Sequence, residues 1–381
     1  MTRTRDQDRC PGALTVHQAA DGALVRVRLP GGMITAGQLV ALAEAAEQFG
    51  SPAMELTSRG NIQIRALTET GAVATALADA GLLPSPSHER ARNIVASPLS
   101  GRHGGIVDVR PLVSQLDEAI QHDPALTGLP GRFWFSLDDG RGDVSGIDAD
   151  AGAHARDDGT FALLLAGRDT GVRLATSDVV PIMIDVARRF VNVRGKAWRI
   201  TELDDRSVVL PDVAPSAAAG ATWPPTMTPP VGWIEQRDSR VALGAALPLG
   251  VLPARTARFL AAIEAPLVIT PWRSVLVCDL DEQTADTSLR VLAPLGLVFD
   301  EESPWLRVSA CTGSPGCANS AADVRAHAAD VARNPAPSDG TGPRSEAHRH
   351  FVGCERACGS PPAGEILVAT EDGYRLHITP P

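Results

Sequence analysis

The feature that most constrains the fold is a strand–helix–strand–helix pattern that occurs twice. In its first occurrence, residues 23–30 (ALVRVRLP) alternate between apolar and polar side chains, as a half-buried strand does. Thr35 and Gln38 then form a capping-box pattern at the start of a helix with an apolar face. Residues 54–67 (MELTSRGNIQIRAL) read as a returning strand, and the Ala- and Leu-rich residues 70–82 predict a second helix.

The same order recurs in the second half of the chain. Residues 240–250 (RVALGAALPLG) predict a strand, 254–265 (ARTARFLAAIEA) a helix, and 266–280 (PLVITPWRSVLVCDL) another strand. A further helix over residues 282–293 ends before a proline and a glycine. Between the copies, residues 211–233 are rich in Pro, Ala and Thr and predict an extended linker.

Each copy is followed by a longer segment of mixed helical and strand pattern, so the sequence predicts four lobes in pseudo-twofold order. At 381 residues the chain is also too long for one ordinary core. Such an arrangement creates a cleft between the halves, where ligand sites tend to form. The alternative is two independent domains without a shared site. The predicted boundaries are 1–87, 88–210, the linker 211–233, 234–300 and 301–381.

Charge and composition exclude several classes of protein. A net charge of −10 argues against non-specific nucleic-acid binding, and no run of about 18 apolar residues predicts a membrane span. The polar start MTRTRDQDRCPG has no apolar signal core, so a cytoplasmic location is expected. Six cysteines are too few for a disulfide scaffold, and the isolated Cys10 and Cys278 are expected to be inert thiols.

The other four cysteines, Cys311, Cys317, Cys354 and Cys358, form a C-x5-C pair and a C-x3-C pair. Structural zinc sites usually have two C-x2-4-C knuckles, whereas thiolates in glycine-rich loops suit the larger [4Fe–4S] cluster. Zinc remains the alternative. The neighbouring glycines would let backbone N–H groups approach the sulfur atoms, and they are Gly313, Gly316, Gly353 and Gly359.

Regular structure is expected on both sides of these cysteines. The segment CANSAADVRAHAADVARN predicts a helix after Cys317, capped by Asn319 or Ser320, whose positive end would lower thiolate pKa values. The segment EILVATEDGYRLHI predicts a hairpin around residues 371–373.

The C-x5-C and C-x3-C pairs resemble the cluster signature of the siroheme sulfite and nitrite reductases, and the duplication is similar to theirs over nearly the whole chain. The resemblance implies an α+β fold of two ferredoxin-like half-domains and two αβ lobes in pseudo-twofold arrangement. In that family the last cysteine bridges the cluster to the tetrapyrrole iron, and Cys358 is the matching position.

Three segments resemble the family's motifs for a tetrapyrrole that carries many carboxylates. LTSRGNIQIR is similar to the first, with Arg59 at the active-site arginine, and ERARNIVASPLSG to the second. Arginine suits such ligands because its planar fork binds carboxylates through paired hydrogen bonds. The implied substrate-binding residues are Thr57, Arg59, Asn61, Arg65, Arg92, Asn93 and Arg132.

The third motif departs from the family pattern. Where the reductases have two lysines that bind and protonate sulfite or nitrite, LPGRFWFSLDDG has Arg132 and Trp134. Tryptophan removes a charge and a proton source, so multi-electron reduction of an oxyanion is in doubt. The implied catalytic residues are Arg59, Arg92, Arg132 and Trp134.

Together with ITPWR, this segment resembles the precorrin-3B synthase branch of the family, which belongs to aerobic cobalamin biosynthesis. That resemblance implies a monooxygenase that converts precorrin-3A to precorrin-3B with O2, by C-20 hydroxylation and γ-lactone formation. The implied cofactors are a [4Fe–4S] cluster on the four cysteines and an additional mononuclear non-haem iron, with siroheme as the weaker expectation. His350 and His103 are the candidate ligands of the second iron, although a structural role is the stronger expectation for each.

No G-x-G-x-x-G nucleotide fingerprint follows a predicted strand, so electrons are expected from a partner reductase or ferredoxin. Two other functions stay open. One is a siroheme-dependent sulfite or nitrite reductase, against which Trp134 argues. The other is a non-catalytic carrier of a tetrapyrrole or an iron–sulfur cluster.

Overall fold

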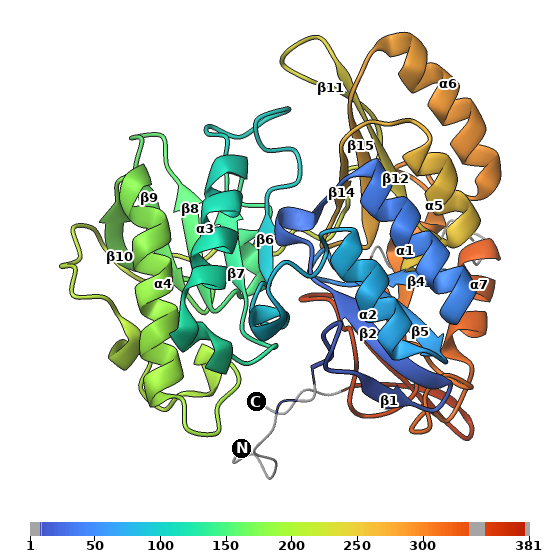
Figure 1. Cartoon of the computed structure of the whole chain (residues 1–381), viewed down its shortest axis with the longest axis horizontal. Helices are drawn as coiled ribbons and strands as arrows, with labels where there is room; N and C mark the ends of the chain where they lie inside the picture. Colours follow the sequence, from blue (N-terminus) through green and yellow to red (C-terminus); the bar gives the residue numbers. More distant parts are fainter. Residues whose placement is uncertain (1–7, 9, 335–346, 378–381) are drawn as a thin grey trace, which may run out of the picture.

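The computed structural model describes residue 8, residues 10–334 and residues 347–377, and these residues form four β-sheets with helices packed against them (Figure 1). The fold is the predicted α+β class. No helix in the described part of the chain has both the length and the apolar character needed to cross a membrane.

The two halves exchange strands. The first half's sheet has the order β1 (His17–Ala19), β2 (Gly22–Val27), β5 (Ile62–Leu67), β4 (Ala53–Leu56) and β13 (Val251–Pro253). The second half's sheet has the order β11 (Gly232–Glu235), β12 (Val241–Ala246), β15 (Ser274–Leu280), β14 (Leu267–Ile269) and β3 (Met33–Ile34). The last strand of each sheet therefore comes from the other half, with Val251 opposite Glu55 and Ile34 opposite Leu267.

This exchange produces one shared hydrophobic core. Helices α1 (Ala36–Phe49) and α2 (Thr70–Asp79) cover the first sheet, and α5 (Ala254–Ala261) and α6 (Glu282–Leu292) belong to the second half, as Figure 1 shows. Leu39 and Leu42 of α1 are fully buried in the same cluster as Leu252 and Leu260. The alternative of two independent domains is wrong, because each half completes the sheet and the core of the other.

The expected single strands over 54–67 and 266–280 are also wrong. Each is a hairpin, β4–β5 and β14–β15, with a tight turn in the middle. Apolar residues stand on both sides of each turn, so the pattern alone did not reveal the reversal. The capping box of α1 is confirmed: Thr35 Oγ1 accepts from the Gln38 N–H, and the Gln38 side chain accepts from the Thr35 N–H.

The first αβ lobe is built on a mixed sheet. Its strands are β6 (Ile94–Ala96), β7 (Phe135–Asp138), β8 (Ala151–Ala155), β9 (Phe161–Leu165) and β10 (Arg168–Leu174), and its long helices are α3 (Arg110–His122) and α4 (Thr176–Val193). It is the green body in Figure 1, with α3 and α4 on one face of the sheet. Phe133, Phe135 and Phe190 meet in its core, with ring centroids 5.0–5.1 Å apart.

The linker is extended, and it packs against this lobe. The N–H groups of Ser216 and Ala217 donate to the Gly171 carbonyl, and the Trp223 ring lies 4.3 Å from that of His154. The last two residues of the predicted linker, 232 and 233, belong to a strand, since β11 begins at Gly232.

The second αβ lobe has strands β16 (Val308–Ala310), β17 (Arg349–Val352), β18 (Glu365–Thr370) and β19 (Gly373–Leu376), and one helix, α7 (Val324–Arg333). β16, β17 and β18 are parallel, whereas β18 and β19 form the predicted hairpin. This lobe carries the four paired cysteines.

Candidate functional site

Parallel strands bring the two cysteine pairs together. β16 and β17 end at the same edge of their sheet, so the residues that follow them, Cys311 and Cys354, start from neighbouring positions. The Cys311 N–H donates to the Phe351 carbonyl at 2.9 Å, and the Gly353 N–H points at the Cys311 sulfur at 3.4 Å. Residues far apart in the sequence thus meet because two strands align.

The loop that carries Cys317 folds back over the end of β17. The Cys317 N–H donates to the Gly313 carbonyl at 2.8 Å, and the Ala321 N–H donates to Gly353 at 3.0 Å. A Cβ at Gly353 would lie 1.8 Å from the Ser320 hydroxyl oxygen, so only glycine permits this approach.

The four thiols share one electrostatic environment. Burial raises the pKa of Cys358, and the negative charges of Cys311, Cys354 and Cys317 raise it further. No three of these sulfur atoms, all in the described part of the chain, lie within 4.8 Å of one another. One tetrahedral zinc would hold them about 3.8 Å apart, given Zn–S bonds of about 2.3 Å. A set of four thiolates fits an iron–sulfur cluster, whose cationic irons would offset this repulsion.

The expected helix cap beside Cys317 is wrong. α7 begins at Val324 with Asp323 as its N-cap, and the Asp323 carboxylate accepts from the Ala326 N–H at 3.0 Å. The Ser320 hydroxyl instead donates to the Ala322 carbonyl at 2.8 Å. Residues 318–323 form a loop that contacts Gly353, so the helix begins later than the composition of the segment indicates.

A cavity of about 330 Å³ adjoins the cysteine site. The first half contributes Arg59, Trp134 and Arg199 to its lining, and the second half contributes Leu249, Trp272 and Arg273. Gly359 and Ser360, which follow Cys358 directly, also line it. A ligand in this cavity would therefore touch both halves of the chain and the loop of the last cysteine.

Two arginines lie beside the Trp134 ring in this cavity. The Arg59 guanidinium lies 5.0 Å from the centre of this ring, and that of Arg199 lies 5.6 Å away. Arg199 Nε donates to the Asp150 carboxylate at 2.6 Å, and burial raises the pKa of Asp150 to about 6 although Arg199 opposes this.

Arg59 has no carboxylate partner among the described residues. Burial, reinforced by the positive charge of Arg199, lowers the pKa of Arg59 to about 9. An anion beside Arg59 would raise this pKa again, because it stabilises the charged guanidinium. The position therefore suits a negatively charged group of a ligand.

The other arginines of the motifs lie outside the cavity lining. Arg92 forms a bidentate pair with Asp117 at 2.7 and 2.8 Å, and Arg132 is half exposed with its guanidinium 5.1 Å from the Trp198 ring. Arg65 pairs with Asp21 and donates to the Gly316 carbonyl at 2.9 Å. Arg65 thereby ties the first half to the loop between Cys311 and Cys317.

The polar residues of the motifs shape the turn that presents Arg59. Thr57 Oγ1 accepts from the N–H groups of Arg59 and Asn61 at 3.3 and 3.1 Å. Asn61 Nδ2 donates to Asn93 Oδ1 at 3.3 Å, and Asn93 Nδ2 donates to the Gly131 carbonyl at 2.8 Å. In this structure Thr57, Asn61 and Asn93 hold the turn and do not line the cavity.

The two candidate histidines do not converge. Both ring nitrogens of His350 have partners, the Ser309 hydroxyl at 2.7 Å and the Cys358 carbonyl at 3.1 Å, and burial lowers its pKa to about 3. His103 is exposed and bonds the Glu235 carbonyl at 2.8 Å. A second iron stays a prediction without a ligand set.

Arg199, Trp272 and Arg273 line the cavity, although the sequence motifs predict no role for them. Trp272 and Arg273 lie within the segment ITPWR. No motif contains Arg199, and its partner Asp150 is 49 residues away in the sequence.

The two isolated cysteines differ from each other. Burial raises the pKa of Cys278 to about 11, which agrees with an inert thiol. Burial would also raise the pKa of Cys10, but the charges of Arg28 and Arg26 outweigh it and lower the pKa. Both arginines donate to the Cys10 sulfur at 3.3 Å, so this thiol is more easily ionised than expected.

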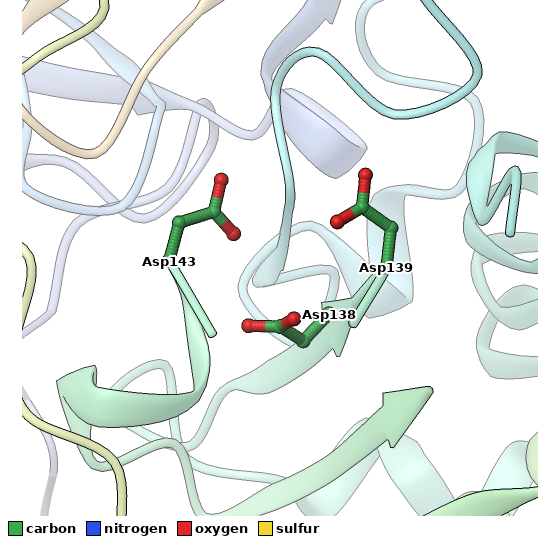
Figure 2. A group of neighbouring side chains, drawn as sticks. All are labelled: Asp138, Asp139 and Asp143. Carbon is green, nitrogen blue, oxygen red and sulfur yellow. The ribbon is translucent and has the colours of Figure 1, made fainter. Parts of the chain in front are cut away.

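Three buried aspartates gather at the end of β7 and on the loop that follows it, as Figure 2 shows: Asp138, Asp139 and Asp143. Asp138 accepts the N–H groups of Gly142 and Val144 at 2.9 and 3.0 Å, and Asp139 pairs with Arg141. Burial and the neighbouring Asp138 raise the pKa of Asp143 to about 7. Asp138 and Asp139 thus organise the loop.

Comparisons with known proteins agree with this fold. Residues 17–78 match the model of the nitrite/sulfite reductase ferredoxin-like half domain. A precorrin-3B synthase from Sinorhizobium sp is 28% identical over 97% of this chain and 82% of its own length. The chloroplastic ferredoxin–nitrite reductase of Zea mays is 27% identical over 90% of this chain and 68% of its own length.

Two further matches are more limited. The ferredoxin–nitrite reductase of Leptolyngbya laminosa is 31% identical, but over 30% of this chain and 24% of its own length. The structure of the Mycobacterium tuberculosis NirA protein superposes with a TM-score of 0.74 over 93% of this chain and 74% of its own, at 18% identity. At that identity the structural likeness supports the fold and leaves the chemistry open.

Proposed function

We propose that this chain is a member of the nitrite/sulfite reductase family, and that it is an oxidoreductase whose substrate is a carboxylated tetrapyrrole. The reaction we propose is that of a precorrin-3B synthase: conversion of precorrin-3A to precorrin-3B with O2, by C-20 hydroxylation and γ-lactone formation. The observation that carries this proposal is the position of Arg59, which lies beside Trp134 in a cavity that adjoins the loop of Cys358 and has no carboxylate partner among the described residues.

The proposed cofactor is a [4Fe–4S] cluster on Cys311, Cys317, Cys354 and Cys358. When bound, such a cluster transfers single electrons. The Gly353 N–H near the Cys311 sulfur would stabilise the thiolate, as hydrogen bonds to cluster sulfurs do. A partner reductase or ferredoxin is proposed as the electron donor.

The cavity residues have separate roles in this proposal. Arg59 binds a substrate carboxylate, which supplies the anionic partner that it lacks. Trp134 offers an apolar ring to the face of the macrocycle and keeps the pocket dry. Asp150 holds Arg199, so that one arginine is neutralised within the protein while the other is free for the ligand.

A nitrite or sulfite reductase is the second candidate, favoured by the similarity to the Zea mays enzyme over most of both chains. Reduction of those anions requires protons at the reacting atoms, and a placed acid commonly contributes about 10²–10⁴-fold. The Trp134 indole N–H does not titrate, and Arg132 is half exposed and lies outside the cavity lining.

The test is to supply reduced enzyme with precorrin-3A and labelled O2, or with sulfite or nitrite, after recording its anaerobic absorption spectrum. We expect label in the tetrapyrrole product and no useful reduction of either anion. Siroheme bands together with rapid six-electron reduction and no label would establish the reductase. Absence of turnover with all three, although a tetrapyrrole binds, would indicate a carrier.

A further inference from the structure

The two hairpin turns that reach the cavity are copies of each other. In both, the first threonine N–H donates to the carbonyl of the fifth residue at 2.9 Å, from Thr57 to Asn61 and from Thr270 to Ser274. The threonine hydroxyl also accepts from the N–H of the third residue at 3.3 Å in each turn. Trp272 therefore occupies the place of Arg59.

The fourth residue of each turn adopts a left-handed backbone. In the first copy it is Gly60, with φ of 65°, and in the second it is Arg273, with φ of 57°. Glycine accepts this conformation freely, whereas a residue with a side chain is strained in it. Such strain persists where the surroundings impose it, and it concentrates at functional sites.

A second pair of positions shows the same difference. Gly31 has φ of 62° in the first copy, and Leu249 has φ of 55° at the matching place in the second. Both strained residues, Leu249 and Arg273, line the cavity. The second copy thus has a strained backbone at two of the positions that place side chains against the cavity.

The Arg273 guanidinium is only partly engaged. One nitrogen, Nη2, donates to the Gly359 carbonyl at 2.7 Å, and Gly359 directly follows Cys358. Within the described part of the chain, Arg273 has no carboxylate partner at salt-bridge distance. A partly buried cation thus faces the cavity, and its remaining N–H groups have no acceptor among the described residues.

We propose that Arg273 is a second carboxylate-binding residue, which holds a carboxylate of the tetrapyrrole and, through the Gly359 carbonyl, positions it relative to the loop of Cys358. This inference rests on the proposed function. Arg59 and Arg273 would then bind the ligand from opposite halves of the chain.

The first copy supplies the test variant, Arg273→Gly. Glycine fits the left-handed backbone, so the melting temperature should be unchanged or higher, and iron and sulfide content should stay at the parent level. Affinity for uroporphyrin, a tetrapyrrole with carboxylates around its ring, should fall about 30-fold or more. Arg273→Lys, which keeps the charge, should bind with intermediate affinity. The exposed Arg290→Gln is the control and should bind as the parent does.

The outcomes separate this inference from the function on which it rests. If the parent protein does not bind uroporphyrin, the tetrapyrrole function itself fails. If the parent binds it and Arg59→Ala weakens binding, but Arg273→Gly binds as tightly as the parent, the role of Arg273 is overturned. Loss of iron in Arg273→Gly would show that Arg273 acts only by supporting the cysteine loop. That result would also overturn its role in binding a carboxylate.

Discussion

The two halves of this protein share a backbone plan and differ in the side chains that reach the cavity. The first half places Arg59 and Gly60 at the tip of its turn, and the second places Trp272 and Arg273 there. The two αβ lobes differ more from each other. The first carries three buried aspartates at and after the end of β7, and the second carries four free cysteines in its C-x5-C and C-x3-C pairs. The two copies thus share a backbone arrangement. The candidate functional residues are at the positions where the copies differ.

The largest expected effect tests whether the cysteines of the second αβ lobe bind the proposed cluster. Cys354→Ser should abolish the proposed cluster, because a serine hydroxyl is a poor substitute for a thiolate ligand. Iron and sulfide analysis after anaerobic reconstitution measures it. Cys278→Ala, which alters a buried thiol of the second half outside the cysteine loops, should retain about four irons. Equal iron in Cys354→Ser and the parent would refute the cluster assignment.

The next comparison separates two arginines that the motifs treat alike. Arg59→Ala should weaken uroporphyrin binding by about 2–5 kcal/mol, because a buried ligand carboxylate loses its partner, and should leave the cluster intact. Titration followed by absorbance measures the affinity.

Arg92→Ala should behave differently, since its partner is Asp117 within the protein. We expect a loss of about 3 kcal/mol in the free energy of unfolding, measured in urea, with unchanged affinity for uroporphyrin. Weaker binding at parental stability would show that the motif identified Arg92 correctly as a ligand residue.

A third comparison uses matching glycines of the two halves. Gly32 and Gly250 have nearly equal φ, 72° and 70°, but a Cβ at Gly32 would lie 1.9 Å from the Ile269 carbonyl oxygen. At Gly250 it would meet the flexible Arg273 side chain at 2.7 Å. Gly32→Ala should therefore cost about 3 kcal/mol of unfolding free energy and Gly250→Ala about 1 kcal/mol. Equal losses would mean that the strand exchange does not restrain the two halves differently.

The smallest effect concerns Asp143 of the first αβ lobe. Its pKa is raised to about 7 in the folded protein, so folding favours the neutral acid. This contribution is fully present below the unfolded pKa near 4 and is lost as pH rises toward 7. Asp143→Asn should thus stabilise the protein by about 2 kcal/mol at pH 8 and change little at pH 4. Destabilisation at pH 8, measured in urea, would show that the Asp143 charge is needed there.

Much of the candidate site was visible in the sequence because its signals are local. The spacing of the cysteines within each pair, the capping box at Thr35 and the β18–β19 hairpin depend on residues a few positions apart. The duplication likewise follows from two patterns that can be compared directly. These features predicted the α+β class and drew attention to Arg59 and Trp134, both of which line the cavity.

What the sequence by itself determined was therefore that one pattern of strands and helices occurs twice, and that the cysteines of the second half form two closely spaced pairs. Only the tertiary structure decided that the halves exchange β3 and β13, and which arginines are free. Asp117 lies 25 residues from Arg92, and Gly359 lies 86 residues from Arg273. A charge is available to a ligand only if packing leaves it without an internal partner, and that depends on contacts that local periodicity does not record.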